Sequence, residues 1–119
     1  MASSICQSLI DKVWRLYADD LDKVPEAEGI YAIGNKAETF LYVGQSDNMR
    51  RRLREHKYGK QDIDKFVKGE FDKNGGVNLH IKWKEDPDHK CAEGEYLECQ
   101  EEKLGYWPEY NKKRGNTCQ

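Results

Sequence analysis

The sequence predicts an α/β (α+β) fold in which a small three-stranded antiparallel sheet is flanked by helices. Residues 29–34 and 39–44 are short runs rich in β-branched and aromatic side chains, joined by a turn at Asn35-Lys36, and together they predict a hairpin. Residues 77–83 alternate apolar and polar side chains, which predicts a half-buried third strand. The 119 residues are predicted to form a single domain, 1–119.

Segments with helical periodicity surround these strands. Apolar residues at three- and four-residue steps predict an extra N-terminal helix within residues 3–20, the main part of an N-terminal helical extension over 1–28. Ser46 or Asp47 is expected to cap the helix that follows the hairpin. Two further helices are expected over 62–71, before the turn at Asn74-Gly75-Gly76, and over 88–104, before Gly105.

Charge is nearly balanced overall but uneven along the chain. The formal net charge is −2, from 20 Lys and Arg against 22 Asp and Glu, so the composition is not that of a strongly basic nucleic-acid binder. A basic tail is expected over residues 112–119. A local basic run after the hairpin is expected either to bind phosphates or to form a solvated helix face, and its members are Arg50, Arg51, Arg54, Lys57 and Lys60.

The sequence also bears on cellular location. No apolar stretch approaches the roughly 18–20 residues that span a bilayer, and no charged segment followed by an apolar run marks a secretory signal. The four cysteines are scattered without a CxxC pair. We therefore expect an intracellular protein, in cytoplasm or nucleus, with reduced thiols and no membrane partner.

Two triplets that each contain a tyrosine are the most informative motif. Gly29-Ile30-Tyr31 and Tyr42-Val43-Gly44 place two phenols on adjacent strands, and Arg52 follows ten residues after Tyr42. A buried phenol needs a hydrogen-bond partner, and a guanidinium group can bind phosphate through paired N–H donors. The combination suits a pocket that handles a phosphate, although strand tyrosines can also pack in an ordinary core.

These motifs resemble those of the GIY-YIG nuclease domain. The resemblance covers residues 29–111 and implies a GIY-YIG-like nuclease core with metal-dependent hydrolysis of DNA phosphodiester bonds. Two departures are that Val43 replaces the family's isoleucine and that Gln45 stands where lysine is frequent. The matching elements are the two triplets, Arg51-Arg52-Leu53-Arg54-Glu55-His56, Leu97-Glu98 in the last predicted helix, and Pro108-Glu109-Tyr110-Asn111.

The resemblance also implies roles for individual residues. Tyr31 resembles the tyrosine that accepts a proton from the attacking water, and Tyr42 would hydrogen-bond phosphate or water. Arg52 would favour the phenolate and clamp the scissile phosphate. Asn111 would fix the wall of the pocket. His56, four residues after Arg52, is expected either to assist proton transfer or to bond to backbone at the helix end.

Glu98 resembles the family's ligand for a divalent cation, Mg²⁺ or Mn²⁺, which takes hard oxygen donors. Glu95, Glu98 and Glu102 recur at helical spacing, so the ligand could be any of the three. The same spacing is also typical of a solvated acidic stripe. Which of the three glutamates could bind a metal depends on which side of this helix is turned toward Tyr31 and Arg52.

The leading interpretation is an endonuclease whose partner is DNA. One alternative is a catalytically weak or inactive nucleic-acid-binding module of the same fold, and another is a protein-interaction domain. The presence of all five matching elements favours the enzyme. Because no helix-turn-helix or zinc finger is recognisable, specificity is expected to come from DNA shape, from a homodimer or from a partner subunit.

Overall fold

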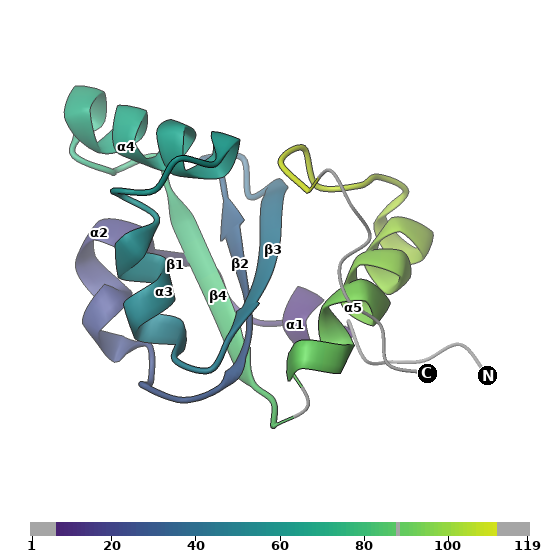
Figure 1. Cartoon of the computed structure of the whole chain (residues 1–119). Coiled ribbons are helices and arrows are strands. Elements are labelled where there is room, and N and C mark those ends of the chain that lie inside the picture. The colour runs from purple at the N-terminus through teal and green to yellow at the C-terminus, as the bar shows by residue number, and fades with distance from the viewer. Residues whose placement is uncertain (1–6, 88, 112–119) are drawn as a thin grey trace.

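The computed structural model describes residues 7–87 and 89–111, with backbone alone for 89–92. The predicted basic tail, 112–119, and the start of the predicted N-terminal helix lie outside these residues. A four-stranded antiparallel sheet runs between two layers of helices (Figure 1). The predicted α+β class is therefore confirmed, with one strand more than expected.

The hairpin that carries the two triplets forms one side of the sheet. β2 is central and all of its residues are buried, whereas β3 is an edge strand. Tyr31 of β2 stands directly opposite Gly44 of β3, and opposite Trp83 of β4 on its other side. The strand order is β1-β4-β2-β3, with bounds Arg15–Leu16, His80–Glu85, Gly29–Gly34 and Phe40–Ser46.

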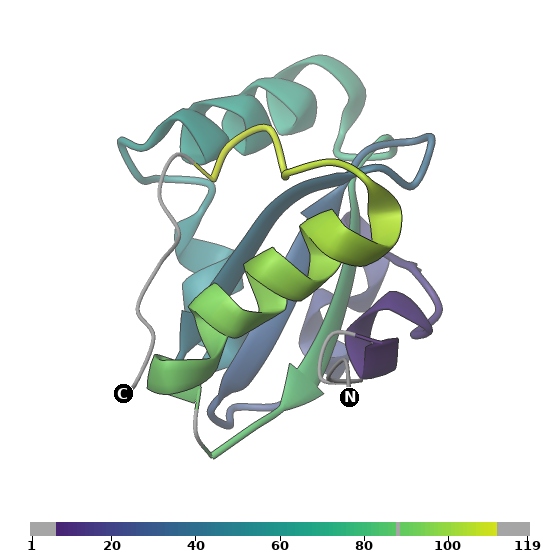
Figure 2. The same ribbon diagram turned by 90° about the vertical axis from the view of Figure 1, so that its right-hand side faces the viewer.

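Helices cover both faces of the sheet. α2 (Tyr17–Asp20), the short 3₁₀ helix η1 (Leu21–Lys23) and α3 (Met49–Glu55) lie on one face (Figure 1). On the opposite face, α5 crosses the strands (Figure 2). No helix of the described residues is long and apolar enough to cross a membrane. The bounds of the remaining helices are Gln7–Ile10 for α1, Asp62–Asn74 for α4 and His89–Leu104 for α5.

Each face of the sheet has its own apolar core. The core under α5 includes Ile30, Val43 and Leu97, and the core under α3 includes Tyr31 and Leu53. The alternation of side chains along β2 divides its residues between the two cores. The tyrosines of the hairpin therefore share the face on which α3 packs.

The N-terminal segment differs most from prediction. The periodicity of residues 3–20 predicts one helix, but the described part of this range contains α1, the strand β1 and α2. Arg15 and Leu16 pair with the outer edge of β4, and the buried ammonium of Lys82 donates to the carbonyl of Ile10 (2.8 Å), the last residue of α1, and to that of Lys12 (3.1 Å). These long-range bonds compete successfully with the local helical pattern.

Three other element boundaries differ from prediction. Asn48, rather than Ser46 or Asp47, caps α3, since its side chain accepts the Arg51 N–H at 3.0 Å. β4 begins at His80, three residues later than predicted, and Val77 is exposed. α4 extends to Asn74, and α5 ends before Gly105 as expected.

The prediction of reduced thiols is wrong for Cys99. This residue lies on the buried side of α5 and is disulfide-bonded. Disulfides persist mainly in oxidising compartments, so this bond does not support the reasoning that led to an intracellular location.

Candidate active site

The hairpin brings the two phenols together. Tyr31 and Tyr42 point to the same face, with ring centroids 6.3 Å apart. A Cβ atom added to Gly44 would lie 2.5 Å from the Tyr31 hydroxyl oxygen, closer than two such atoms can approach. The glycine of the second triplet therefore leaves room for the tyrosine of the first.

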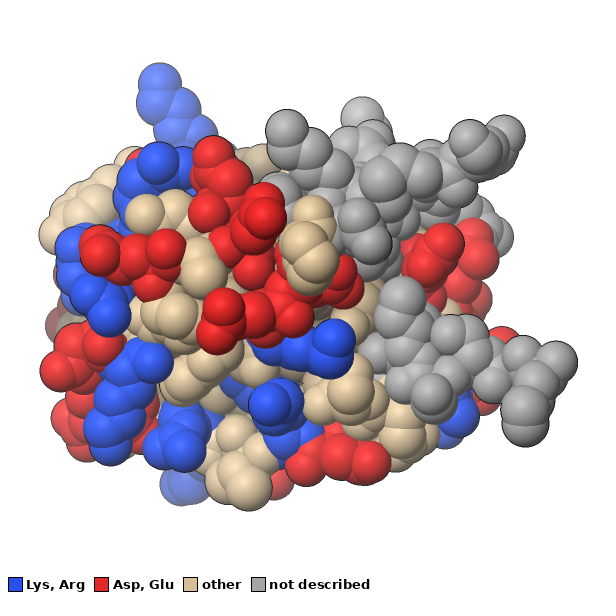
Figure 3. All heavy atoms as spheres, turned by 90° about the horizontal axis from the view of Figure 1, so that it is seen from below, with Lys and Arg blue, Asp and Glu red and all other residues tan. Residues whose placement is uncertain are grey.

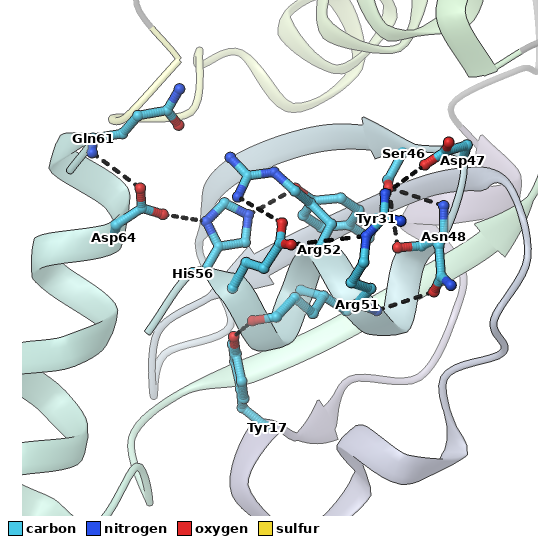
Figure 4. Close-up of polar contacts among 12 residues, drawn as sticks. Tyr17, Tyr31, Ser46, Asp47, Asn48, Arg51, Arg52, His56, Gln61 and Asp64 are labelled. Carbon is cyan, nitrogen blue, oxygen red and sulfur yellow. Dashed lines mark hydrogen bonds and ion pairs between the residues drawn. The ribbon is translucent and has the colours of Figure 1, made fainter. Parts of the chain in front are cut away.

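α3 adds a histidine to this pair. Arg52 and His56 are four residues apart and so lie on one side of the helix. The His56 ring is fully buried, and its Nε2 lies 2.7 Å from the Tyr31 hydroxyl oxygen. Its Nδ1 is hydrogen-bonded to Asp64 of α4, which gives a continuous chain Tyr31–His56–Asp64 (Figure 4). The alternative that His56 bonds to backbone through its side chain is therefore wrong.

Burial controls the protonation of these groups. It raises the pKa of Tyr31 well above 10, an effect that Tyr42 adds to and Arg52 opposes. Burial also lowers the pKa of His56 to about 4, although the hydrogen bond to Asp64 opposes this shift. At neutral pH, Tyr31 is therefore a neutral phenol hydrogen-bonded to a neutral imidazole.

Arg52 supplies positive charge to the two tyrosines. Its guanidinium lowers the pKa of both Tyr31 and Tyr42 against the larger effect of burial. The side chain is partly exposed and lies 3.8 Å from the Glu55 carboxylate. A partly exposed guanidinium beside two phenols can contact an incoming phosphate, in keeping with its predicted role.

Of the α5 glutamates, Glu93 is the one whose charge acts on both tyrosines. The Glu93 charge raises the pKa of both Tyr31 and Tyr42, and its side chain is half-buried. Glu98 follows the fully buried Leu97 directly, so it is turned about 100° away around the helix axis and is exposed. Glu95 and Glu102 are exposed as well, and the predicted acidic stripe is therefore a solvent-facing side of α5.

The sequence contained a signal for Glu93 that the Leu97-Glu98 pair obscured. Glu93 precedes the buried Tyr96 and Leu97 by three and four residues, which places it on the same side of the helix. Asp64 was also missed. Its signal is the spacing Gln61-x-x-Asp64 at the start of α4, a pattern of the capping-box kind.

Asn111 is bound to the edge strand β3 through its side chain. Its side-chain Oδ1 accepts the Val43 N–H at 2.8 Å, and its Nδ2 donates to the Val43 carbonyl at 2.9 Å. The neighbouring Tyr110 N–H donates to Leu41. The segment after α5 is thereby bound along β3 like a further strand, beside the two tyrosines.

The basic run is only partly available to a ligand. Arg50 donates to the Val24 carbonyl at 2.7 Å, and Arg51 lies 2.8 Å from the Asp47 carboxylate. On the lower face of the molecule, acidic and basic side chains are interspersed (Figure 3). Lys57 lies over the ring of Phe71 at 4.3 Å. The exposed members of the run are Arg51, Arg54 and Lys60.

Comparison with known proteins agrees with this geometry. The family model described as the GIY-YIG catalytic domain matches residues 27–116. The match spans the hairpin, α3, α5 and the segment that carries Asn111. A search of curated proteins gave no match.

Proposed function

The chain belongs to the GIY-YIG catalytic-domain family, whose members are generally endonucleases, and from this premise we propose that it hydrolyses DNA phosphodiester bonds. The observation that carries the proposal is the hydrogen bond between Tyr31 and the buried His56, 2.7 Å long, beside a second tyrosine and Arg52. A purely structural pair of tyrosines needs neither the neighbouring histidine nor the guanidinium.

Each of these residues matches a requirement of the reaction. Hydrolysis needs a base for the attacking water and positive charge for the developing charge on the phosphate. The Tyr31 oxygen would accept the proton of the water, and Arg52 would bind the phosphate. Tyr42 would donate a hydrogen bond to a phosphate oxygen, while Asn111 keeps the pocket wall in place.

GIY-YIG nucleases typically use divalent metals, and the donors present here fit such an ion. Among the described residues, no group of three or more His, Cys, Asp or Glu side chains gathers as a metal cluster. Mg²⁺ and Mn²⁺ do not require one, because a single carboxylate with waters and substrate phosphate suffices. We propose Glu93, rather than Glu98, as that carboxylate, since its charge acts on both tyrosines. When bound, the ion would neutralise charge on the phosphate.

A cleavage panel tests the proposal. Plasmid, linear, single-stranded and branched DNA are incubated with the protein and Mg²⁺ or Mn²⁺, with and without a chelator. The wild type is expected to produce new DNA ends on at least one substrate, and chelation and Tyr31→Phe are each expected to abolish them. Lys103→Ala, on the exposed end of α5, serves as the matched control. Cleavage that survives in Tyr31→Phe would contradict the assigned role of this phenol.

A second candidate is a DNA-binding module of the same fold without catalysis. The burial of Tyr31, which is 1% exposed, favours this reading, because a general base must meet water. Such a module would bind DNA with a strong dependence on salt concentration and produce no new ends. The cleavage panel, run beside a gel-shift assay, distinguishes the two candidates.

A further inference from the structure

We propose that Asp64 is a positioning residue for cleavage: it holds the His56 imidazole with the Nδ1 proton on its own side, so that Nε2 accepts the Tyr31 proton. This inference rests on the proposed function, and it deepens that function by assigning a role to a buried carboxylate outside the family motifs. Its evidence is the geometry around His56 and around the start of α4.

The three groups form an unbroken chain through the protein interior. The Tyr31 hydroxyl lies 2.7 Å from His56 Nε2, and His56 Nδ1 is hydrogen-bonded to Asp64 Oδ1. His56 is fully buried and Asp64 is 2% exposed, so water does not compete for either bond. The three residues come from β2, from the end of α3 and from α4, and the packing of these elements sets their mutual geometry (Figure 4).

The carboxylate is itself held on two sides. Asp64 is the third residue of α4, where its Oδ2 accepts the Gln61 N–H at 3.0 Å as part of a capping box. A Cβ atom on Gly59 would collide with the Asp64 carboxylate, so this glycine leaves the space that the carboxylate occupies. Asp64 is therefore fixed before substrate binds, as a group that orients another group must be.

The hydrogen bonds define the tautomer of His56. A carboxylate can only accept, so Nδ1 must carry the proton that faces Asp64. Nε2 of the neutral ring is then an acceptor, and the Tyr31 hydroxyl donates to it. With its proton turned toward His56, the Tyr31 oxygen keeps its lone pairs for a proton from water.

The resulting proton movement is balanced. The attacking water gives a proton to the Tyr31 oxygen as the Tyr31 proton passes to His56 Nε2, and the hydroxide oxygen forms a bond to phosphorus. The bond between phosphorus and the leaving oxygen breaks, and that oxygen takes a proton from solvent. The imidazolium, stabilised by the Asp64 carboxylate, then returns its proton to the Tyr31 oxygen, which releases the proton taken from the water to solvent. The groups that face His56 are Asp64, Tyr31, Tyr42, Arg52 and Glu55.

Asp64→Asn removes the orienting property with almost no change in size. The wild-type carboxylate accepts two hydrogen bonds, one from the Gln61 N–H and one from His56 Nδ1–H. Asparagine has one carbonyl oxygen and one NH₂ group, so it cannot accept both. If the asparagine oxygen keeps the hydrogen bond from the Gln61 N–H, the asparagine NH₂ group faces His56 Nδ1. Nδ1 must then accept a hydrogen bond, so the imidazole proton lies on Nε2, where it points at the Tyr31 hydroxyl proton.

The test combines the tautomer of His56, read from imidazole ¹⁵N chemical shifts, with single-turnover cleavage. We expect wild-type His56 to be neutral with Nδ1–H, and Asp64→Asn to carry Nε2–H with cleavage about 100-fold slower or more. Gln61→Ala is the matched control, because it removes half of the capping box and leaves the carboxylate in place. It should lower thermal stability without changing the tautomer or the cleavage rate.

Three results would overturn the inference. The first is an Nε2–H tautomer in the wild type, which needs no variant to detect and so remains decisive if Asp64→Asn does not fold. The second is an unchanged Nδ1–H tautomer in Asp64→Asn. The third is a switched tautomer with wild-type cleavage. If the wild type has the expected tautomer but cleaves no DNA, the proposed function fails, whereas the assigned geometry of Asp64 and His56 stands.

Discussion

Burial of His56 makes the stability of this fold depend on pH. Its pKa falls from 6.5 to about 4, chiefly because burial disfavours the imidazolium. Between these two values the unfolded chain binds a proton at His56 and the folded chain does not. Stability is therefore complete above pH 6.5 and is lost as the pH falls toward 4. The interval of about 2.5 pH units, at about 1.4 kcal/mol each, corresponds to about 3–4 kcal/mol.

Urea denaturation between pH 7.5 and pH 4 measures this loss. His56→Gln is the reference, because glutamine offers one donor and one acceptor, as neutral histidine does, but does not titrate. Carboxylates that do not contact His56 titrate alike in both proteins, so the difference between their pH profiles reports on His56 together with its partner Asp64. The wild type should lose about 3–4 kcal/mol more than His56→Gln over this range. Parallel profiles, or an NMR titration of His56 near pH 6.5, would refute the reasoning.

Three further predictions follow from the site and the core. Gly44→Ala should push the Tyr31 phenol from its position, costing about 1–3 kcal/mol in urea denaturation and most of the cleavage activity. Glu93→Gln should abolish stimulation of cleavage by Mg²⁺ or Mn²⁺, whereas Glu98→Gln should retain it. Thiol titration of the denatured, unreduced protein should find fewer than four reactive thiols, because Cys99 is disulfide-bonded.

Each of these predictions has a control or an opposing outcome. Gly69→Ala places a methyl group where nothing lies within 4 Å, so it should leave cleavage unchanged and not destabilise the fold. If Glu98→Gln rather than Glu93→Gln removes the metal response, the assignment of the ligand is wrong. Four thiols before reduction would contradict the disulfide.

Local signals predicted the hairpin and the helix after it. The triplets are rich in strand-forming residues and are separated by a turn, so β2 and β3 follow from neighbouring residues alone. The helical periods of α4 and α5 are similarly local. The N-terminal segment was mispredicted because Arg15 and Leu16 pair with β4, about 65 residues away in sequence, which no local period reveals.

The residues of the candidate site likewise divide into those that local spacing predicts and those that only long-range packing brings in. Tyr31, Tyr42 and Arg52 lie near one another because fixed spacing on a hairpin and one helix determines their neighbours. To choose the glutamate that could bind a metal, one must know how α5 is oriented about its own axis. The Leu97-Glu98 pair does not contain that information. Asp64 joins the site only through the packing of α4 against the end of α3.

Single-turnover cleavage by wild type and Tyr31→Phe, with DNA affinity measured on the same preparations, tests the central claim most directly. The account predicts that both proteins bind DNA equally well and that only the wild type produces metal-dependent new ends. It is contradicted if both proteins cleave at the same rate, or if the wild type binds DNA and never cleaves it.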